Sequence, residues 1–194
     1  FLACLVAVPL VDSLGLLWVG LEGATAVSAL LVGFHRTPAA LEAAWKYLII
    51  GSLGIGFALL GTVLLYASTV AAFGETPEAL NWSFLMANAG SLDANLVRLG
   101  FAFVLVCYVT TTGLAPFHTW LPAAHCQAPS PVSALLSGAT LAIGLYALIR
   151  VHLVAGAALG PGFSSGLLVA FGLLSLAVAL PFLVAQGDLK RLLA

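Results

Sequence analysis

A proline-rich segment interrupts the longest uncharged part of this chain. Residues 99 to 149 contain no Asp, Glu, Lys or Arg, and within them Pro116 to Gly138 holds four prolines and two histidines, His118 and His125. Because proline cannot continue a helix, an apolar helix has to break here. Non-helical backbone inside a membrane persists only where protein or a water-filled cavity satisfies its polar groups. The segment therefore predicts a path for a small polar species, most simply protons.

The amino-acid composition indicates that the rest of the chain also lies in a membrane. Charged residues make up 7% and hydrophobic residues 62% of the 194 residues, whereas a soluble domain has roughly 25% charged residues. We therefore expect an all-α, multi-pass protein of the inner (plasma) membrane, in contact with the lipid bilayer. The net charge of −1 provides no basic surface for nucleic acid.

Five apolar runs are long enough to cross a bilayer, which takes about 20 residues. A polar loop over 73–97, with Trp82 and Phe84, is typical of a short interfacial segment, and a turn is expected over 156–162. A shorter run over 1–11 indicates the end of a further span, so we expect 1–194 to be a single transmembrane-domain fragment of a longer protein. The five expected spans cover about 14–34, 43–70, 97–114, 132–153 and 163–185, the last with Pro181 inside it.

The basic residues favour one orientation in the membrane. The connections between the expected spans alternate sides, and cytoplasmic connections carry an excess of Lys and Arg. The side predicted to be cytoplasmic receives Arg36, Lys46, Lys190 and Arg191, and the opposite side receives Arg98 and Arg150.

Glu22 is the first candidate for chemistry because it lies inside an expected span. It is about eight residues into the run, a depth of roughly 12 Å at 1.5 Å per residue. Inserting a charge there costs about 2.5–3.5 kcal/mol, and an intramembrane carboxylate is a functional-site hypothesis by default. In a low dielectric a carboxyl group favours its neutral form. Glu22 is therefore predicted to load and release a proton, and the alternative is a protonated or paired structural glutamate.

Lys46 and Thr111 are two further candidates for the proton path. Lys46 is interpreted as an entry residue coupled to Glu22, and the alternative is a lysine that extends to the interface and pairs with Glu42. Thr111 belongs to a hydroxyl cluster over 110–112. Such hydroxyls are expected to hydrogen-bond carbonyls of the preceding turn; they can order water but cannot store a charge.

His118 and His125 flank the expected break and complete the set of candidates. A neutral imidazole accepts a proton on one nitrogen and donates one from the other, which suits a relay. The alternative is that both rings satisfy carbonyl groups of the broken helix.

The cysteines give no indication of a cofactor. Cys4, Cys107 and Cys126 are scattered, with neither a CxxC motif nor a Cys/His ligand spacing, so no metal site or haem attachment is expected. Catalytic and nucleotide-binding motifs are also missing from the sequence. We therefore expect no redox centre, cofactor or metal in this chain, and leave open whether it is part of an enzyme.

Three stretches of the sequence resemble a known family. The central one runs from Pro116-Phe-His-Thr-Trp-Leu-Pro-Ala-Ala-His125 to Ala128-Pro-Ser-Pro-Val-Ser-Ala-Leu-Leu-Ser-Gly138, and the others are Leu16-Leu-Trp-Val-Gly-Leu-Glu22 and Gln186-Gly-Asp-Leu-Lys-Arg-Leu-Leu-Ala194. Together they resemble the antiporter-like membrane subunits of respiratory complex I, Mrp-type cation/proton antiporters and membrane-bound [NiFe] hydrogenases. With Ala40-Leu-Glu-Ala-Ala-Trp-Lys-Tyr47 added, the likeness is closest to the hydrogenase-4 component F type.

The resemblance implies a fold of about fourteen helices with two inverted repeats, each forming a half-channel. This chain would hold most of the first repeat and the start of the second. Glu22 matches the family's key glutamate, Lys46 a basic position near the start of the next helix, and His118 the histidine after the break. Other membrane subunits and hydrophilic redox subunits are the implied partners.

The sequence also departs from the family pattern at three positions. Thr111 stands where the broken helix usually has a lysine, Ala142 where the next helix has a lysine, histidine or amide, and Ala123 where the motif has Asp. Glu22 therefore lacks the cation that normally adjusts its protonation.

These features leave three functions open. The first is a proton-conducting membrane-arm subunit of a redox-driven complex, of the hydrogenase-4 or NADH:quinone oxidoreductase type. The second is a non-conducting scaffold subunit, which the three departures favour. The third is a subunit of an Mrp-type cation/proton antiporter.

Overall fold

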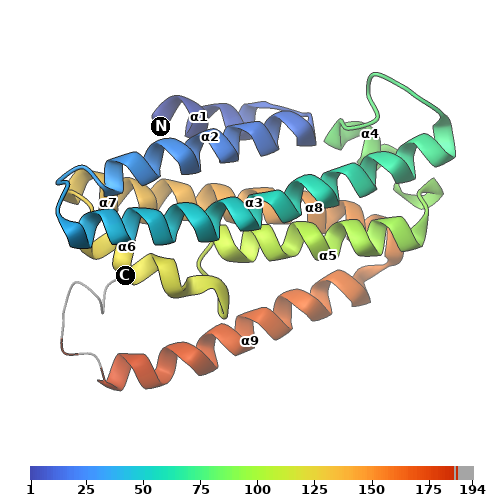
Figure 1. The fold of residues 1–194 in the computed structure, drawn as a ribbon. Coiled ribbons are helices and arrows are strands. Elements are labelled where there is room, and N and C mark those ends of the chain that lie inside the picture. Colours follow the sequence, from blue (N-terminus) through green and yellow to red (C-terminus); the bar gives the residue numbers. More distant parts are fainter. Residues whose placement is uncertain (186, 188–194) are drawn as a thin grey trace.

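The chain folds into a layered bundle of long helices. The structure is a computed structural model that describes residues 1–185 and 187, and nearly all of these are helical (Figure 1). Single helical turns η1 (Ala89–Ser91), η2 (Phe117–Thr119) and η3 (Leu136–Thr140) join some of the helices. The helices are α1 (Leu2–Leu10), α2 (Leu14–Val32), α3 (Pro38–Phe73), α4 (Trp82–Ala87), α5 (Ala94–Thr111), α6 (Trp120–Gln127), α7 (Ser130–Leu135), α8 (Leu141–Leu159) and α9 (Pro161–Ala185).

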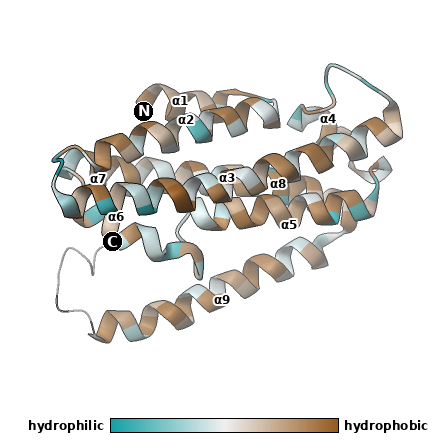
Figure 2. Cartoon of the chain, viewed as in Figure 1, coloured by the Kyte–Doolittle hydropathy of each residue, from teal (hydrophilic) through white to brown (hydrophobic). Residues whose placement is uncertain are grey.

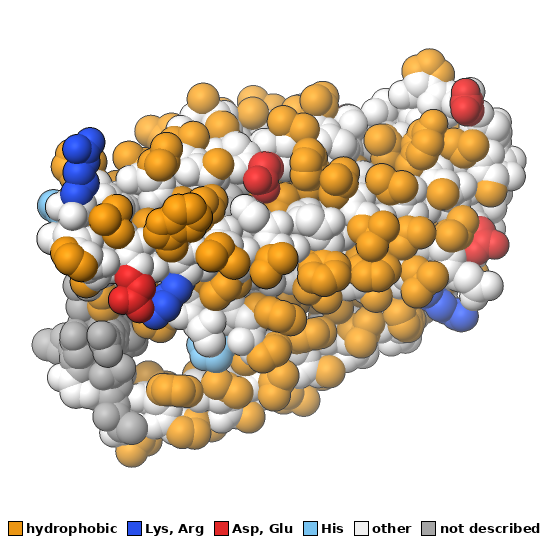
Figure 3. Space-filling model, in the orientation of Figure 1, with side chains coloured by type: hydrophobic (Ala, Val, Ile, Leu, Met, Phe, Trp, Pro, Cys, Tyr) orange, Lys and Arg blue, Asp and Glu red, His pale blue; other side chains and the backbone are white. Residues whose placement is uncertain are grey.

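The five predicted membrane spans are confirmed. The described part of the chain has five helical segments long and apolar enough to cross a bilayer, and α7, η3 and α8 together form one of them. Apolar residues cover the outside of these helices, whereas polar residues gather at their ends and connections (Figure 2). Charged side chains lie mainly at the two ends of the bundle (Figure 3). This is the pattern of a multi-pass integral membrane protein.

Local capping explains why two spans begin earlier than predicted. Pro38 occupies the first turn of α3, and the Thr37 side chain accepts a hydrogen bond from the Ala40 N–H, which is a standard helix start. The Asp93 carboxylate does the same for α5, by accepting from the N–H groups of Asn95 and Leu96. The short α4 lies in the loop where an interfacial segment was expected.

The turn predicted over 156–162 is present but shorter than predicted. Helix α8 continues through Gly156 to Leu159, and the chain reverses only at Gly160, whose φ is 80°. Glycine inside a helix costs only about 1 kcal/mol, and neighbouring alanines and leucines extend the helix past Gly156. Helix α9 likewise passes through Pro181 without ending.

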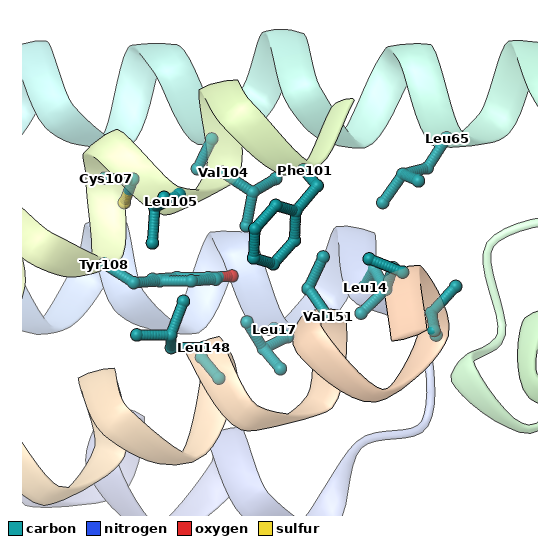
Figure 4. Packing of buried hydrophobic residues seen from close by; sticks show 14 of the residues in the cluster. Leu14, Leu17, Leu65, Phe101, Val104, Leu105, Cys107, Tyr108, Leu148 and Val151 are labelled. Atoms are coloured by element: carbon teal, nitrogen blue, oxygen red, sulfur yellow. The ribbon is translucent and has the colours of Figure 1, made fainter. Parts of the chain in front are cut away.

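The main core lies between α2, α3, α5 and α8. Leu17, Phe101, Tyr108, Leu148 and Val151 are buried there side by side (Figure 4). Helices α3 and α5 approach closely at Gly61, where an added Cβ would lie 2.5 Å from Cγ2 of Val104. Such small residues allow close helix contact in lipid, and this contact fixes α5 up to the point where it breaks.

Arg150 joins three elements at the end of the bundle near α4. Its guanidinium lies 5.2 Å from the ring centre of Trp82 and 5.0 Å from that of Tyr146. It also donates a hydrogen bond to the Val11 carbonyl, and the Trp82 indole donates one to the Arg150 carbonyl. These contacts anchor α8 to α4 and to the connection between α1 and α2.

Candidate functional site

The predicted break lies between α5 and α6. At the break, α5 ends in a helix-capping motif. After Thr111 the N–H of Gly113 bonds the Thr110 carbonyl and the N–H of Leu114 bonds the Val109 carbonyl, which is the Schellman arrangement. Gly113 has a φ of 71°, a conformation that favours glycine. The helix therefore ends by a specific device a few residues before Pro116, whose peptide bond with Ala115 is cis.

The three threonines before the break bond backwards, as predicted. Thr110 Oγ1 donates to the Val106 carbonyl at 2.7 Å, and Thr111 Oγ1 to the Cys107 carbonyl at 3.1 Å. Thr112 Oγ1 donates to the Tyr108 carbonyl at 2.6 Å. Each hydroxyl hydrogen at the end of α5 is thereby committed to its own helix.

Protein groups satisfy the irregular backbone of the break. The indole Nε1 of Trp120 donates to the Thr110 carbonyl at 2.9 Å. From the other side, Oγ of Ser175 on α9 accepts the Ala115 N–H at 2.9 Å. Non-helical backbone at membrane depth requires such partners, and here α6 and α9 provide them.

Glu22 lies at the same depth as the end of α5. On the stripe of α2 that faces α3, Trp18 donates its indole N–H to the Ile55 carbonyl, and Thr25 touches Gly51, where an added Cβ would lie 2.8 Å from its methyl. Glu22 is between these two contacts, level with Gly54. A Cβ added at Gly54 would lie 3.1 Å from Cβ of Thr110 on α5. The fold thus brings the intramembrane carboxyl group to the level of the break.

Cys107 is buried on α5 one helical turn before Thr111, and its sulfur lies 4.0 Å from Thr111 Oγ1. Glu22 is half-buried and has no hydrogen bond or ion pair within the part of the chain that the structure describes. The intramembrane carboxyl group therefore has no charged partner there.

Lys46 does not lie at this depth. It is two helical turns closer to the connection between α2 and α3 than Gly54, roughly 12 Å at 1.5 Å per residue. Its Nζ pairs with Oε1 of Glu42 at 2.5 Å, and the two side chains are 57% and 65% exposed. The alternative interpretation of Lys46, pairing with Glu42, is therefore the one that the structure shows, and Lys46 lies away from Glu22.

His118 lines a cavity beside the break. The cavity has a volume of about 560 Å³ and lies between the break and α9. Its polar lining comes from His118, Thr112, Thr119 and Ser175. The His118 Nδ1 atom is buried and has no hydrogen-bond partner among the described residues, while the ring packs edge-on against Phe182. An imidazole nitrogen thus remains available beside the cavity.

His125 is held in a different environment. It is 4% exposed, and its Nδ1 lies 2.8 Å from Oγ of Ser133 on α7. It therefore connects α6 to α7 across the second pair of prolines, seven residues beyond His118. The structure places Glu22 and Thr111 at a similar depth, and it places His118 and His125 in succession after the break.

Several polar residues of this region were not predicted. Oγ of Ser28 and the hydroxyl of Tyr47 lie 2.8 Å apart and are buried between α2 and α3. Thr140 is buried at the end of η3, and Ser175 reaches the break from α9. Single hydroxyls in otherwise apolar runs are the only sequence signal for these positions. Within the described residues, no group of three or more His, Cys, Asp and Glu could hold a metal ion.

This architecture defines a class of multi-pass membrane protein with one helix broken at the depth of an intramembrane carboxyl group. The comparisons with known proteins identify the family. The chain belongs to the NADH:quinone oxidoreductase/Mrp antiporter transmembrane family, whose model matches residues 11–194. The resemblance inferred from the central motif is therefore confirmed. The third stretch of that resemblance, with Lys190 and Arg191, lies outside the described residues apart from Gly187.

Two curated relatives show how far the similarity extends. A hydrogenase-4 component F homolog from Methylacidiphilum infernorum is 43% identical over 94% of this chain. An NADH-quinone oxidoreductase subunit N from Trichlorobacter lovleyi is 30% identical over 92% of it. The chain spans only 38% and 36% of the lengths of these relatives.

Two solved structures share the fold. A chain of the membrane-bound sulfane sulfur reductase, an archaeal respiratory membrane complex, matches 94% of this chain with a TM-score of 0.83 and 26% identity. A chain of respiratory complex I from Thermus thermophilus matches 94% with a TM-score of 0.73 and 30% identity. This chain covers 36% and 37% of those chains.

Proposed function

We propose that this chain forms a proton-conducting half-channel in a membrane-arm subunit of a redox-driven complex, of the hydrogenase-4 or NADH:quinone oxidoreductase type. The observation that carries the proposal is the common depth of Glu22 and the end of α5, next to a cavity that His118 lines. A carboxyl group that can change protonation, a helix break and an imidazole with an available nitrogen are the parts that a proton path needs.

The path would run from Glu22 past Thr111 to His118 and His125. Glu22 would load and release the proton, and Thr111 would order water without carrying charge. The histidines would pass the proton on, because each ring can accept at one nitrogen and donate from the other. Lys46, near the end of α3 that is predicted to be cytoplasmic, would line the entrance of the path. No cofactor is assigned to this path, and the redox centres would lie in hydrophilic partner subunits.

A scaffold function is the second candidate, and the contacts of Thr111 favour it. Thr111 stands where the family has a lysine, and its hydroxyl hydrogen is committed to the Cys107 carbonyl. Without a cation here, Glu22 has no charged partner on its inner side in the described part of the chain. A subunit of this kind would pack between neighbouring membrane subunits without conducting.

Replacing Glu22 with Gln in the full-length subunit of the assembled complex separates the two functions. Gln keeps the size of the side chain but cannot release a proton. If the path conducts, proton movement into vesicles per electron transferred falls, whereas Glu75→Gln in the exposed loop after α3 leaves it unchanged. Unchanged proton movement in the Glu22 variant would support the scaffold, and a requirement for Na⁺ or K⁺ would support the antiporter type.

A further inference from the structure

A second, much smaller cavity lies in the middle of the bundle. It is enclosed by α2, α3, α5, α6 and η3 and has a volume of about 10 Å³. A cavity of this size holds about one water molecule if it is polar enough. Its walls are formed by Thr25, Tyr47, Gly51, Thr110, Thr111, Trp120 and Thr140.

Two of the wall hydroxyls can only accept hydrogen bonds from the cavity. Thr110 and Thr111 donate their hydroxyl hydrogens to the carbonyls of Val106 and Cys107. A hydroxyl has one hydrogen and two lone pairs. Their oxygens therefore retain lone pairs, and a donor is required to use them.

The Tyr47 hydroxyl can also only accept hydrogen bonds from the cavity, because its hydrogen is used in another bond. Ser28 donates its only hydroxyl hydrogen to the Thr25 carbonyl at 3.0 Å. The 2.8 Å bond between Ser28 and Tyr47 must then use the Tyr47 hydrogen. The Tyr47 oxygen is left as a third acceptor on the cavity wall.

Thr140 supplies a hydroxyl without a partner among the described residues. The side chain is 2% exposed, and Oγ1 has no hydrogen-bond partner among the described residues. Thr140 closes the π-helical turn η3, and the neighbouring α8 fits tightly against α5, since a Cβ at Gly144 would lie 3.1 Å from the Thr111 methyl. Because π-helical turns are rare and costly, one that ends in a buried, unpartnered hydroxyl requires an explanation.

We propose that this cavity binds one water molecule. The water would accept the Thr140 hydroxyl hydrogen and donate its own two hydrogens to two of the acceptors among Thr110, Thr111 and Tyr47. No carboxylate lines the cavity, so a cation there would have no compensating charge. A neutral ligand with two donors and two acceptors matches the wall.

The bound water would join segments that direct contacts leave separate. It links the Ser28–Tyr47 pair of α2 and α3 to the end of α5 and to η3, on both sides of the broken helix. The site is a structural feature and does not rest on the proposed proton path. A subunit that moves no protons would still hold the water.

The substitution Thr140→Val in the full-length protein tests the proposal by the direction of its effect. Valine has the shape of threonine without the hydroxyl. If the water is bound, the variant loses one of its partners and melts several degrees lower in detergent. If the cavity is dry, the variant removes an unpaired buried hydroxyl and melts at the same or a higher temperature. Thr69→Val, at a buried threonine of α3 that bonds only its own helix, controls for the loss of a hydroxyl.

A density map that resolves ordered water gives the second measurement. The wild-type protein and Thr140→Ser, which retains the hydroxyl, should each show a peak within hydrogen-bond distance of residue 140. The valine variant should show none. A wild-type map without this peak would overturn the proposal even if the valine variant were destabilised.

Discussion

A hydrogen bond between the Trp120 indole and the Thr110 carbonyl joins the two sides of the broken helix. Trp120 is the first residue of α6, Thr110 lies in the last turn of α5, and the hydrogen bond between them is 2.9 Å long. The ring also packs on Tyr47 of α3, with 4.6 Å between ring centres. This side chain therefore ties α6 to both α5 and α3.

We expect Trp120→Phe to destabilise the protein by about 1–3 kcal/mol, because it removes a buried hydrogen bond and leaves space beside Tyr47. The melting temperature of the full-length protein in detergent should fall by several degrees. Trp45→Phe is the matched control, since Trp45 is 62% exposed on α3. Equal melting temperatures for the two variants would show that the indole does not brace the break.

The backbone conformation of Gly113 is the second feature that shapes the break. Its φ is 71°, and an added Cβ would lie 2.3 Å from Cδ1 of Leu121. We expect Gly113→Ala to cost about 1–3 kcal/mol from backbone strain, with the clash in addition. The double variant with Leu121→Ala should show less than the sum of the two separate losses, because the shortened side chain removes the clash. Strict additivity would contradict the predicted contact.

Gly56→Ala serves as the control for this experiment. Gly56 lies in α3, and an added Cβ there would meet no atom within 4 Å. Alanine is favoured over glycine in a helix interior by about 1 kcal/mol, so this variant should be neutral or slightly more stable.

The sequence was sufficient to predict the spans, the break and the back-bonded threonines, because each depends on local physics. A run of apolar residues, a cluster of prolines and three successive hydroxyls produce their effects within a few residues. The end of α8 was misplaced because Gly156 is tolerated where flanking residues favour a helix. The common depth of Glu22 and Thr110 could not be predicted, since it depends on how α2, α3 and α5 pack.

The small cavity proposed to bind water was even harder to predict from the sequence. Thr25, Tyr47, Thr111 and Thr140 come from four segments, and none stands out within its own run. Only the packed structure shows that the hydroxyl hydrogens of Tyr47 and Thr111 are used elsewhere and that the Thr140 hydroxyl has no partner among the described residues. The orientation in the membrane and the extent of the domain remain predictions.

Ser175 is expected to hold α9 against the break. Its Oγ accepts the Ala115 N–H at 2.9 Å and donates to the Phe171 carbonyl at 2.8 Å. Ser175→Ala leaves the Ala115 N–H unpaired beside the cavity, which costs about 1–3 kcal/mol. Amide hydrogen exchange at residue 115 should therefore become faster in the full-length protein. Ser52→Ala in α3 should leave this rate unchanged, and a protected amide in the Ser175 variant would rule out the contact.

The Glu42–Lys46 pair tests whether Lys46 contributes to stability. The two residues are four apart with the glutamate first, the favourable order on a helix, and both side chains are more than half exposed. Exposed pairs contribute little to stability, and less at high salt. A double-mutant cycle with Glu42→Gln and Lys46→Gln in the full-length protein should therefore give nearly additive changes in melting temperature. Strongly non-additive changes would mean that other segments cover this pair in the whole protein, which would place Lys46 inside the membrane rather than at its entrance.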